Sequence, residues 1–157
     1  MIAVLDNIRS NHNVGSIFRT ADAFGIKTIY LCGITPQPVD RFGRPNKELL
    51  KVALKAERYV PWEYAPKTYV LLDKLKYEGY TVYALEQSKK SRPISAVRLP
   101  KARQAKAALV VGNEVKGLSG ALLKRADHII EIPMVGKKES LNVAVAFGIA
   151  AYALVAQ

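Results

Sequence analysis

Short apolar segments alternate along the chain with segments of helical periodicity, and this alternation constrains the possible fold most. The strand-like segments are Ile2–Leu5, Ile26–Cys32, Thr81–Leu85, Ala107–Val111 and His128–Ile132. The helical segments are Asn13–Phe24, Lys47–Ala56, Lys67–Tyr77, Ser119–Arg125 and Leu141–Ala156. Because strands separated by helices form parallel sheets, we predict an α/β fold with a mostly parallel sheet and helices on both faces. No repeat interrupts the pattern, so we expect one domain over residues 1–157.

The composition excludes several classes of protein. Half of the residues are hydrophobic, which is typical of a globular chain with a real core. We expect no membrane segment and no secretory leader, and therefore a cytoplasmic protein. Cys32 is the single cysteine, so an internal disulfide and a multi-cysteine metal site are excluded. Neither histidine has partners at metal-ligand spacing, and we predict no metal.

The charge is strongly basic. Lys and Arg number 24 against 13 Asp and Glu, a net charge of +11. Such a balance favours a polyanionic partner, although solvated surface lysines would give the same count. One cluster follows the second strand, and from it we select Arg41, Arg44 and Lys47 as candidate RNA contacts.

Polar and glycine-rich segments follow three of the predicted strands, where α/β sheets bind their ligands. They read DNIRSNHNVGSIFRT, GNEVKGLS and IPMVGKKESLN. Gly112 and Gly117 have the spacing of a P-loop, but Leu118 stands where the phosphate-binding lysine belongs. We therefore expect no NTPase, and the absence of G-x-G-x-x-G argues against an ordinary dinucleotide fold.

The first and last of these segments each open a helix. In the first helix we expect Gly15, Ser16, Arg19, Asp22 and Ala23 to face away from the apolar stripe. Arg19 either pairs with Asp22 one turn on or meets a polyanionic substrate. Ser140 is expected to cap the last helix, which is apolar on nearly every face. In so small a domain, that pattern predicts burial against a second copy of the chain.

Together the three segments resemble, in order and spacing, the signature motifs of the SpoU (TrmH-like) family of RNA 2′-O-ribose methyltransferases, in the SPOUT superfamily. The matching stretches are NVGSIFRTADAFG from residue 13, GNEVKGL from residue 112, and IPM with SLNVAVA from residues 132 and 140. The resemblance implies an α/β fold with a C-terminal trefoil knot. It also implies a homodimer through the last helix. The cofactor would be S-adenosyl-L-methionine, with S-adenosyl-L-homocysteine as product.

The resemblance also implies which residues form the site. The cofactor would contact Leu85, Gly112, Glu114, Gly117, Ile132, Met134, Ser140, Leu141 and Asn142. The catalytic set would be Arg19, Asn13, Glu114, Ser140 and Asn142, with Arg19 also on the RNA. The reaction would methylate a ribose 2′-hydroxyl in tRNA or rRNA, with Arg19 either as general base or as a stabiliser of negative oxygen. A separate N-terminal RNA-binding domain, present in many members, is not expected.

Two alternatives stay open at this point. One is a non-catalytic RNA-binding or assembly factor built on the same fold. The other is a base methyltransferase of the wider superfamily. The retained polar residues Asn13, Arg19 and Glu114 favour an enzyme, and the motif around Arg19 favours the ribose as its target.

Overall fold

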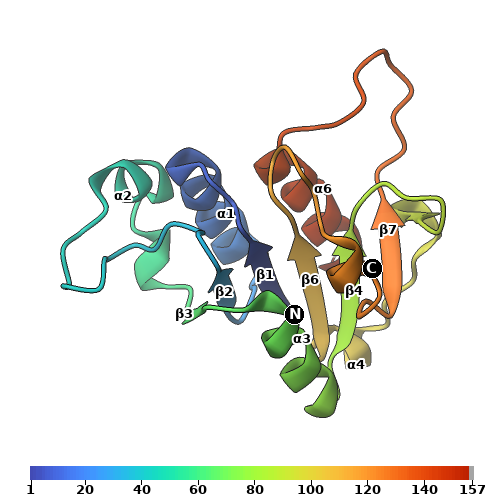
Figure 1. The fold of residues 1–157 in the computed structure, drawn as a ribbon, viewed down its shortest axis with the longest axis horizontal. Helices are drawn as coiled ribbons and strands as arrows, with labels where there is room; N and C mark the ends of the chain where they lie inside the picture. The colour runs from blue at the N-terminus through green and yellow to red at the C-terminus, as the bar shows by residue number, and fades with distance from the viewer. Residues whose placement is uncertain (156–157) are drawn as a thin grey trace.

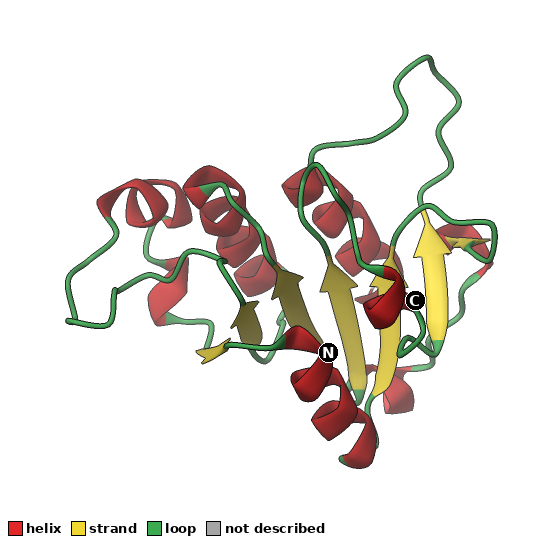
Figure 2. Cartoon of the chain, in the orientation of Figure 1, coloured by secondary structure: helices red, strands yellow, loops and turns green. Residues whose placement is uncertain are grey.

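The computed structural model describes residues 1–155, with every side chain among them except that of Ala102. Within this range the strands are β1 (Ile2–Asp6), β2 (Ile29–Cys32), β3 (Trp62–Ala65), β4 (Thr81–Leu85), β5 (Arg92–Pro93), β6 (Ala107–Val111) and β7 (His128–Glu131). They form one sheet in the order β3-β2-β1-β6-β4-β7-β5, and every pair in it is parallel (Figures 1 and 2). The predicted α/β fold with a mostly parallel sheet is confirmed.

The helices connect these strands and cover both faces of the sheet (Figure 1). They are α1 (Asn11–Ala23), α2 (Lys47–Ala53), α3 (Thr68–Tyr77), α4 (Lys101–Gln104), α5 (Gly120–Leu123) and α6 (Val143–Val155), with short 3₁₀ turns η1 (Ala56–Arg58) and η2 (Ile94–Ala96). The side chains of α1 and α6 pack in one hydrophobic core, and those of α3 and α5 pack in the other.

The alternation of side chains along the central strands creates these two cores. On β1, Ala3 and Leu5 belong to the core under α1 and α6, whereas Ile2 and Val4 belong to the other. Successive side chains of a strand point to opposite faces, so a strand buried on both faces is apolar at nearly every position. All five residues of β1 and of β6 are buried, which explains the continuous apolar sequences Ile2–Leu5 and Ala107–Val111. The last residue of β1, Asp6, is buried as well, and its carboxylate accepts from the hydroxyl of Thr68.

Three local predictions were wrong. Strands β3 and β5 were not predicted, because both are short edge strands with charged or exposed residues. Gly15 is buried and does not face solvent: a Cβ there would lie 2.7 Å from the carbonyl oxygen of Leu49 in α2. The last helix begins at Val143, after Ser140 and Leu141, and the predicted end at Ala156 lies outside the described residues.

Candidate functional site

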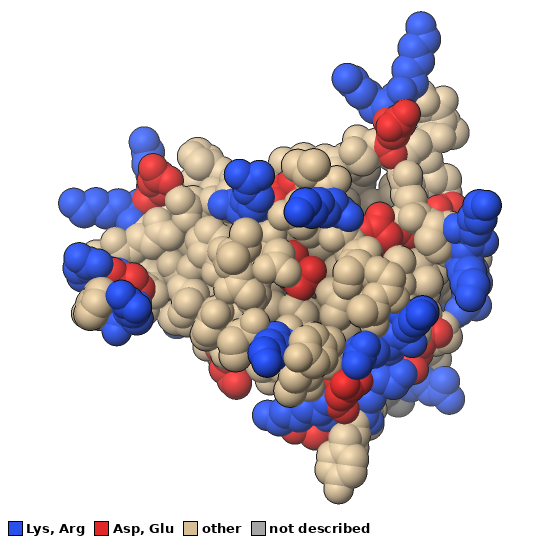
Figure 3. All heavy atoms as spheres, viewed as in Figure 1, with Lys and Arg blue, Asp and Glu red and all other residues tan. Residues whose placement is uncertain are grey.

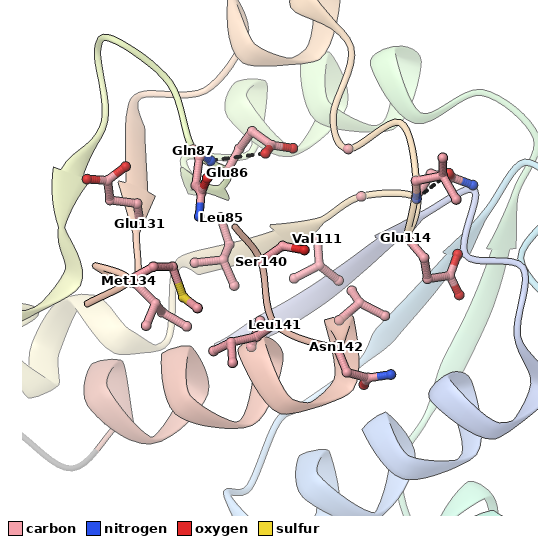
Figure 4. A pocket seen from close by; sticks show the side chains of 17 residues that line it. Leu85, Glu86, Gln87, Val111, Glu114, Glu131, Met134, Ser140, Leu141 and Asn142 are labelled. Atoms are coloured by element: carbon pink, nitrogen blue, oxygen red, sulfur yellow. Dashed lines mark hydrogen bonds between the residues drawn. The ribbon is translucent and has the colours of Figure 1, made fainter. Parts of the chain in front are cut away.

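A pocket of about 440 Å³ lies beyond the carboxyl ends of β4, β6 and β7 (Figure 4). Its size is within the range of pockets that hold small molecules and cofactors. Among the residues that line it are all nine that were predicted to contact a cofactor: Leu85, Gly112, Glu114, Gly117, Ile132, Met134, Ser140, Leu141 and Asn142. Segments that are far apart in the sequence therefore meet in one pocket. The pocket lies beyond the carboxyl ends of the strands, where the strand pattern predicted a ligand site.

A chain of hydrogen bonds joins the three sequence motifs at one side of this pocket. The carboxylate of Glu114 accepts from the side-chain amide of Asn13 at 2.9 Å and from the backbone N–H groups of Arg9 and Ser10 at 3.0 and 3.1 Å. Asn13 Oδ1 in turn accepts from Asn142 Nδ2 at 3.0 Å. Glu114, Asn13 and Asn142 thus hold the start of α1, the loop after β6 and the start of α6 together.

Asn142 also replaces Ser140 as the cap of α6. Its Oδ1 accepts from the backbone N–H of Ala144 at 2.9 Å and from that of Val145 at 3.4 Å. An asparagine is as good a cap as serine, and the helix starts one residue after it. Ser140 is left on an exposed segment that lines the pocket, where its hydroxyl is available to a ligand.

The environment of Glu114 keeps its carboxylate ionised. Partial burial by itself raises the pKa of Glu114, but the hydrogen bonds from Asn13, Arg9 and Ser10 outweigh burial, and the pKa lies below its ordinary value. At neutral pH this residue is therefore an anion with its donors in place. It is suited to hold the motifs together and unsuited to act as a general acid.

The glycines of the second motif are required by the shape of their own loop. A Cβ on Gly112 would lie 2.6 Å from the backbone of Gly117, so the two ends of the loop touch. Gly117 has φ +61°, and a Cβ there would lie 2.2 Å from the carboxylate of Glu86. That carboxylate accepts the backbone N–H of Leu118 at 2.7 Å. Gly112 therefore closes the loop and also lines the pocket.

The segment after β4 contributes pocket residues that sequence reasoning missed. Glu86 and Gln87 line the pocket, and Gln87 Nε2 donates to the backbone carbonyl of Glu139 at 2.7 Å. Further along, Ser91 Oγ donates to Glu131, another lining residue, at 2.6 Å. Both Glu86 and Gln87 directly follow a predicted strand. Their position beyond the carboxyl end of this strand is the signal that could have identified them.

Arg19 is not among the residues that line the pocket. It is exposed on α1, six residues beyond Asn13, which corresponds to about 9 Å along a helix axis. Within the described residues it makes no ion pair with Asp22. The neighbouring Thr20 faces α6, where a Cβ on Gly148 would be 3.7 Å from its methyl group. One chain alone therefore does not bring Arg19 to the pocket.

Helix α6 presents an uncovered apolar stripe, formed by Val145, Ile149 and Tyr152. These side chains are 52%, 41% and 60% exposed, and their spacing places them on one face of the helix. The opposite face, with Phe147, Ala151 and Leu154, is fully buried. The sequence prediction of a helix that is apolar on all sides is confirmed, and a single chain covers only part of it.

The basic residues selected from the sequence lie away from the pocket. Arg41, Arg44 and Lys47 are exposed on and after the loop between β2 and α2, at the end of the molecule opposite β7 (Figure 1). Lys and Arg side chains are prominent at this end in the space-filling view (Figure 3). A ligand that contacts both them and the pocket must therefore extend along the sheet.

Residues 1–155 offer neither a metal-binding cluster nor a membrane-spanning helix. The side chains described contain no group of three or more His, Cys, Asp or Glu that is placed to hold a metal ion. None of the described helices is both long and apolar enough to cross a bilayer.

The fold and the pocket define an α/β protein with a pocket of ligand size at the carboxyl ends of parallel strands. The family model of the SpoU rRNA methylases matches residues 1–152. The chain belongs to the SpoU rRNA methylase family, and the resemblance drawn from the three motifs is confirmed.

Individual relatives agree with this assignment. An uncharacterized tRNA/rRNA methyltransferase of Synechocystis is 33% identical over 100% of this chain and 38% of its own length. The tRNA (guanosine(18)-2′-O)-methyltransferase of Aquifex aeolicus is 32% identical over 97% of this chain and 67% of its own. A crystal structure of an AdoMet-bound rRNA methyltransferase from Sinorhizobium meliloti superposes with a TM-score of 0.82, at 27% identity, over 98% of this chain and 54% of that one. The chain thus spans from 38% to 67% of the length of these proteins.

Proposed function

We propose that this protein transfers a methyl group from S-adenosyl-L-methionine to a ribose 2′-hydroxyl of tRNA or rRNA. The observation that carries the proposal is the joining of the three motifs by Glu114, Asn13 and Asn142 at the edge of one pocket. The names of relatives support the chemistry, because one is a tRNA 2′-O-methyltransferase and another a 23S rRNA 2′-O-methyltransferase. Because the proposed substrates are tRNA or rRNA, we also propose a cytoplasmic location.

The pocket fits this cofactor. Carboxylates of Glu86, Glu114 and Glu131 lie around it, and carboxylates favour a ligand with a positive centre. Apolar side chains of Leu85, Met134, Leu141 and Val143 supply walls for an aromatic ring. When bound, the sulfonium supplies an activated methyl group. The protein has only to align that group with the hydroxyl oxygen and assist the loss of its proton.

Arg19 is the residue that we propose for the substrate side of the reaction. A guanidinium stays protonated at neutral pH, so Arg19 is better suited to stabilise negative charge on the ribose oxygen or to hold the adjacent phosphate than to remove a proton. Ser140, exposed at the pocket, is proposed to position the substrate or the cofactor. Asn13, Glu114 and Asn142 are proposed to keep that geometry.

We propose that Arg19 reaches the pocket of a second chain in a symmetric dimer. The stripe of Val145, Ile149 and Tyr152 supports a self-complementary interface through α6, because it is apolar and otherwise uncovered. Helix α1 packs beside α6 through Thr20, so Arg19 lies close to that interface. The start of α6 borders the pocket at Asn142, which places the interface and the pocket on one element.

We also propose that the described chain is one domain with a trefoil knot near its C-terminal end. Three segments around the pocket are tied to one another: Gln87 after β4 bonds to Glu139 after β7, and Glu86 bonds to Leu118 after β6. These contacts hold together the loops that the proposed knot would interlace, and knots are rare among proteins. Stretching the chain by its termini should give a final contour length shorter than that of an unknotted chain, and the full length would contradict the knot.

The central test is methyl transfer. RNA from a strain that lacks the gene is incubated with the purified protein and labelled S-adenosyl-L-methionine. Label should appear on the ribose and make the adjacent linkage resistant to alkali, because the 2′-hydroxyl is blocked. Label on a base would indicate a base methyltransferase. If the protein binds RNA but transfers no methyl group, the non-catalytic alternative is favoured. This conclusion holds whether or not calorimetry detects cofactor binding.

The shared site is tested by mixing inactive variants. Arg19→Ala chains and Asn142→Ala chains are combined under conditions in which exchange of subunits has been verified. A heterodimer then holds one site with neither substitution, and activity should return toward half of that of a wild-type dimer. If exchanged heterodimers stay inactive, Arg19 acts within its own chain.

A further inference from the structure

A second hollow, of about 470 Å³, lies at the other end of the molecule from the cofactor pocket. It is formed between the loop that joins β2 to α2 and the edge strand β3. Its walls include Ile34, Arg41, Phe42 and Arg44 from the loop and Tyr64 from the strand. Two aromatic rings and two guanidinium groups thus border one cavity on the surface.

Asp40 gives the tip of this loop a fixed shape. Its Oδ1 accepts the backbone N–H groups of Phe42 and Arg44 at 2.8 and 2.9 Å, and its Oδ2 accepts Arg44 Nε at 2.7 Å. The backbone closes the same turn through bonds from Asp40 N to the Arg44 carbonyl and from Gly43 N to the Asp40 carbonyl, both 2.9 Å. The tip is therefore preorganised before any partner arrives.

This turn holds Phe42 exposed, with two cations close to its ring. The ring is 67% exposed, and the guanidinium carbons of Arg41 and Arg44 lie 4.8 and 5.1 Å from its centroid. A single exposed apolar side chain is ordinary on a protein surface. A ring that a fixed turn presents with flanking arginines is the arrangement that nucleic-acid-binding proteins use to stack a base and hold its phosphates.

The charges around the hollow also suit an anion. Asp40 is the carboxylate in its wall, and the hydrogen bonds it accepts from Arg44 and Phe42 lower its pKa, so it stays ionised and engaged. Arg44 uses Nε for this contact, which leaves its terminal nitrogens for a phosphate. Arg41 forms no ion pair with any side chain in residues 1–155.

We propose that this hollow binds an unpaired base of the RNA substrate, stacked on Phe42, with the neighbouring phosphates at Arg41 and Arg44. The inference rests on the proposed function and extends it, because it assigns a single-stranded element of the RNA to a place remote from the reaction. Paired bases in a duplex are already stacked on each other and do not offer a free face. The site therefore selects RNA with a loop, bulge or end at a set distance from the methylated ribose.

The test uses a nine-nucleotide single-stranded RNA with 2-aminopurine at its centre, whose fluorescence falls when the base stacks. Wild-type protein should bind it and quench the signal. Phe42→Ala should weaken binding by roughly 5- to 150-fold, the range for loss of one base–aromatic stack, and should abolish the quenching. Phe42→Tyr keeps a ring and should retain both. Tyr77→Ala, which removes a 94% exposed aromatic far from the hollow, is the matched control and should behave as wild type.

The proposal is overturned if wild-type protein does not quench the probe, if Phe42→Ala binds and quenches like wild type, or if Tyr77→Ala is equally impaired. Calorimetry with S-adenosyl-L-methionine on the same proteins distinguishes a failure of the proposed methyltransferase function from a failure of the proposed base-binding site. If wild-type protein does not bind S-adenosyl-L-methionine, the proposed function is rejected, whatever the fluorescence of the RNA probe shows. With substrate RNA, Phe42→Ala should raise KM and leave kcat near its wild-type value, because Phe42 is remote from the reacting atoms.

Discussion

Replacing Glu114 should weaken the fold and the pocket together, since its carboxylate accepts from Arg9 N, Ser10 N and Asn13 Nδ2. A typical protein hydrogen bond contributes about 0.5–1.5 kcal/mol net, and solvent exposure at this site favours the lower half of that range. Glu114→Ala should therefore reduce the free energy of unfolding by about 1.5–3 kcal/mol. Glu114→Gln keeps the shape and one acceptor oxygen, and we expect a loss of about 1 kcal/mol.

The pH dependence identifies the carboxylate as the cause. The pKa of Glu114 is lower in the folded protein than its ordinary value, so its stabilisation is full above the ordinary carboxyl pKa and is lost as the pH falls through the folded pKa. The difference between wild type and Glu114→Gln should be constant near neutral pH and shrink below about pH 4.3. Asp40 and Asp127 also have lowered pKa values, but they are common to both proteins and cancel.

Urea unfolding followed by circular dichroism from pH 3 to pH 7 measures these differences. Glu63→Gln serves as the control, because this exposed carboxylate on β3 accepts no hydrogen bond from a side chain or backbone group that the structure describes. The reasoning is refuted if Glu114→Ala unfolds with a free energy close to that of wild type. It is also refuted if the difference between wild type and Glu114→Gln stays constant down to pH 3. Glu114→Ala should further weaken cofactor binding by calorimetry, because Asn13 then loses the partner that orients it toward Asn142.

One thiol reagent and two glycine substitutions test other parts of the structure. Burial raises the pKa of Cys32 to about 12, so native protein should not react with a thiol reagent at pH 8, whereas urea-unfolded protein should react within seconds to minutes. Gly148→Ala meets only ordinary contact in α6 and should raise the free energy of unfolding by about 0.5–1 kcal/mol, measured by urea unfolding. Gly117→Ala places a Cβ against the Glu86 carboxylate at positive φ and should lower that free energy by at least ~1 kcal/mol; an unchanged value would show that the loop shifts freely.

Much of the fold followed from apolar patterning. Thr81–Leu85 and Ala107–Val111 were predicted with the bounds that the structure has, because a central strand buried on both faces leaves an unbroken apolar segment. The edge strand Trp62–Ala65 was missed since none of its residues is fully buried and its two central residues, Glu63 and Tyr64, are exposed. A local apolar pattern indicates which residues are buried. An edge strand buries few of its residues, so its pattern is weak.

The residues that line the site could be predicted from the sequence, whereas the contacts among them could be predicted only in part. The pocket gathers the nine cofactor candidates, but the residue that caps α6 is Asn142 and not Ser140. Either residue type caps a helix, and only the path of the chain decides which one stands at the right place. Gly15 was misplaced for a similar reason. Its close contact with α2 depends on how two helices cross, which a single helix pattern does not contain.

The bond between Gln87 and Glu139 has a consequence for how the chain acquires its pocket during synthesis. One wall emerges from the ribosome about fifty residues before the other, and α6 follows later still. At the usual pace of translation, several seconds separate them. In that interval the early part of the sheet can form without any competent binding site. Cofactor in the cell then stabilises only chains whose last segments have docked, by about 2.7 kcal/mol at a hundredfold excess over its Kd. Ligand binding therefore stabilises the chain only after the late segments that form the pocket have docked on the sheet.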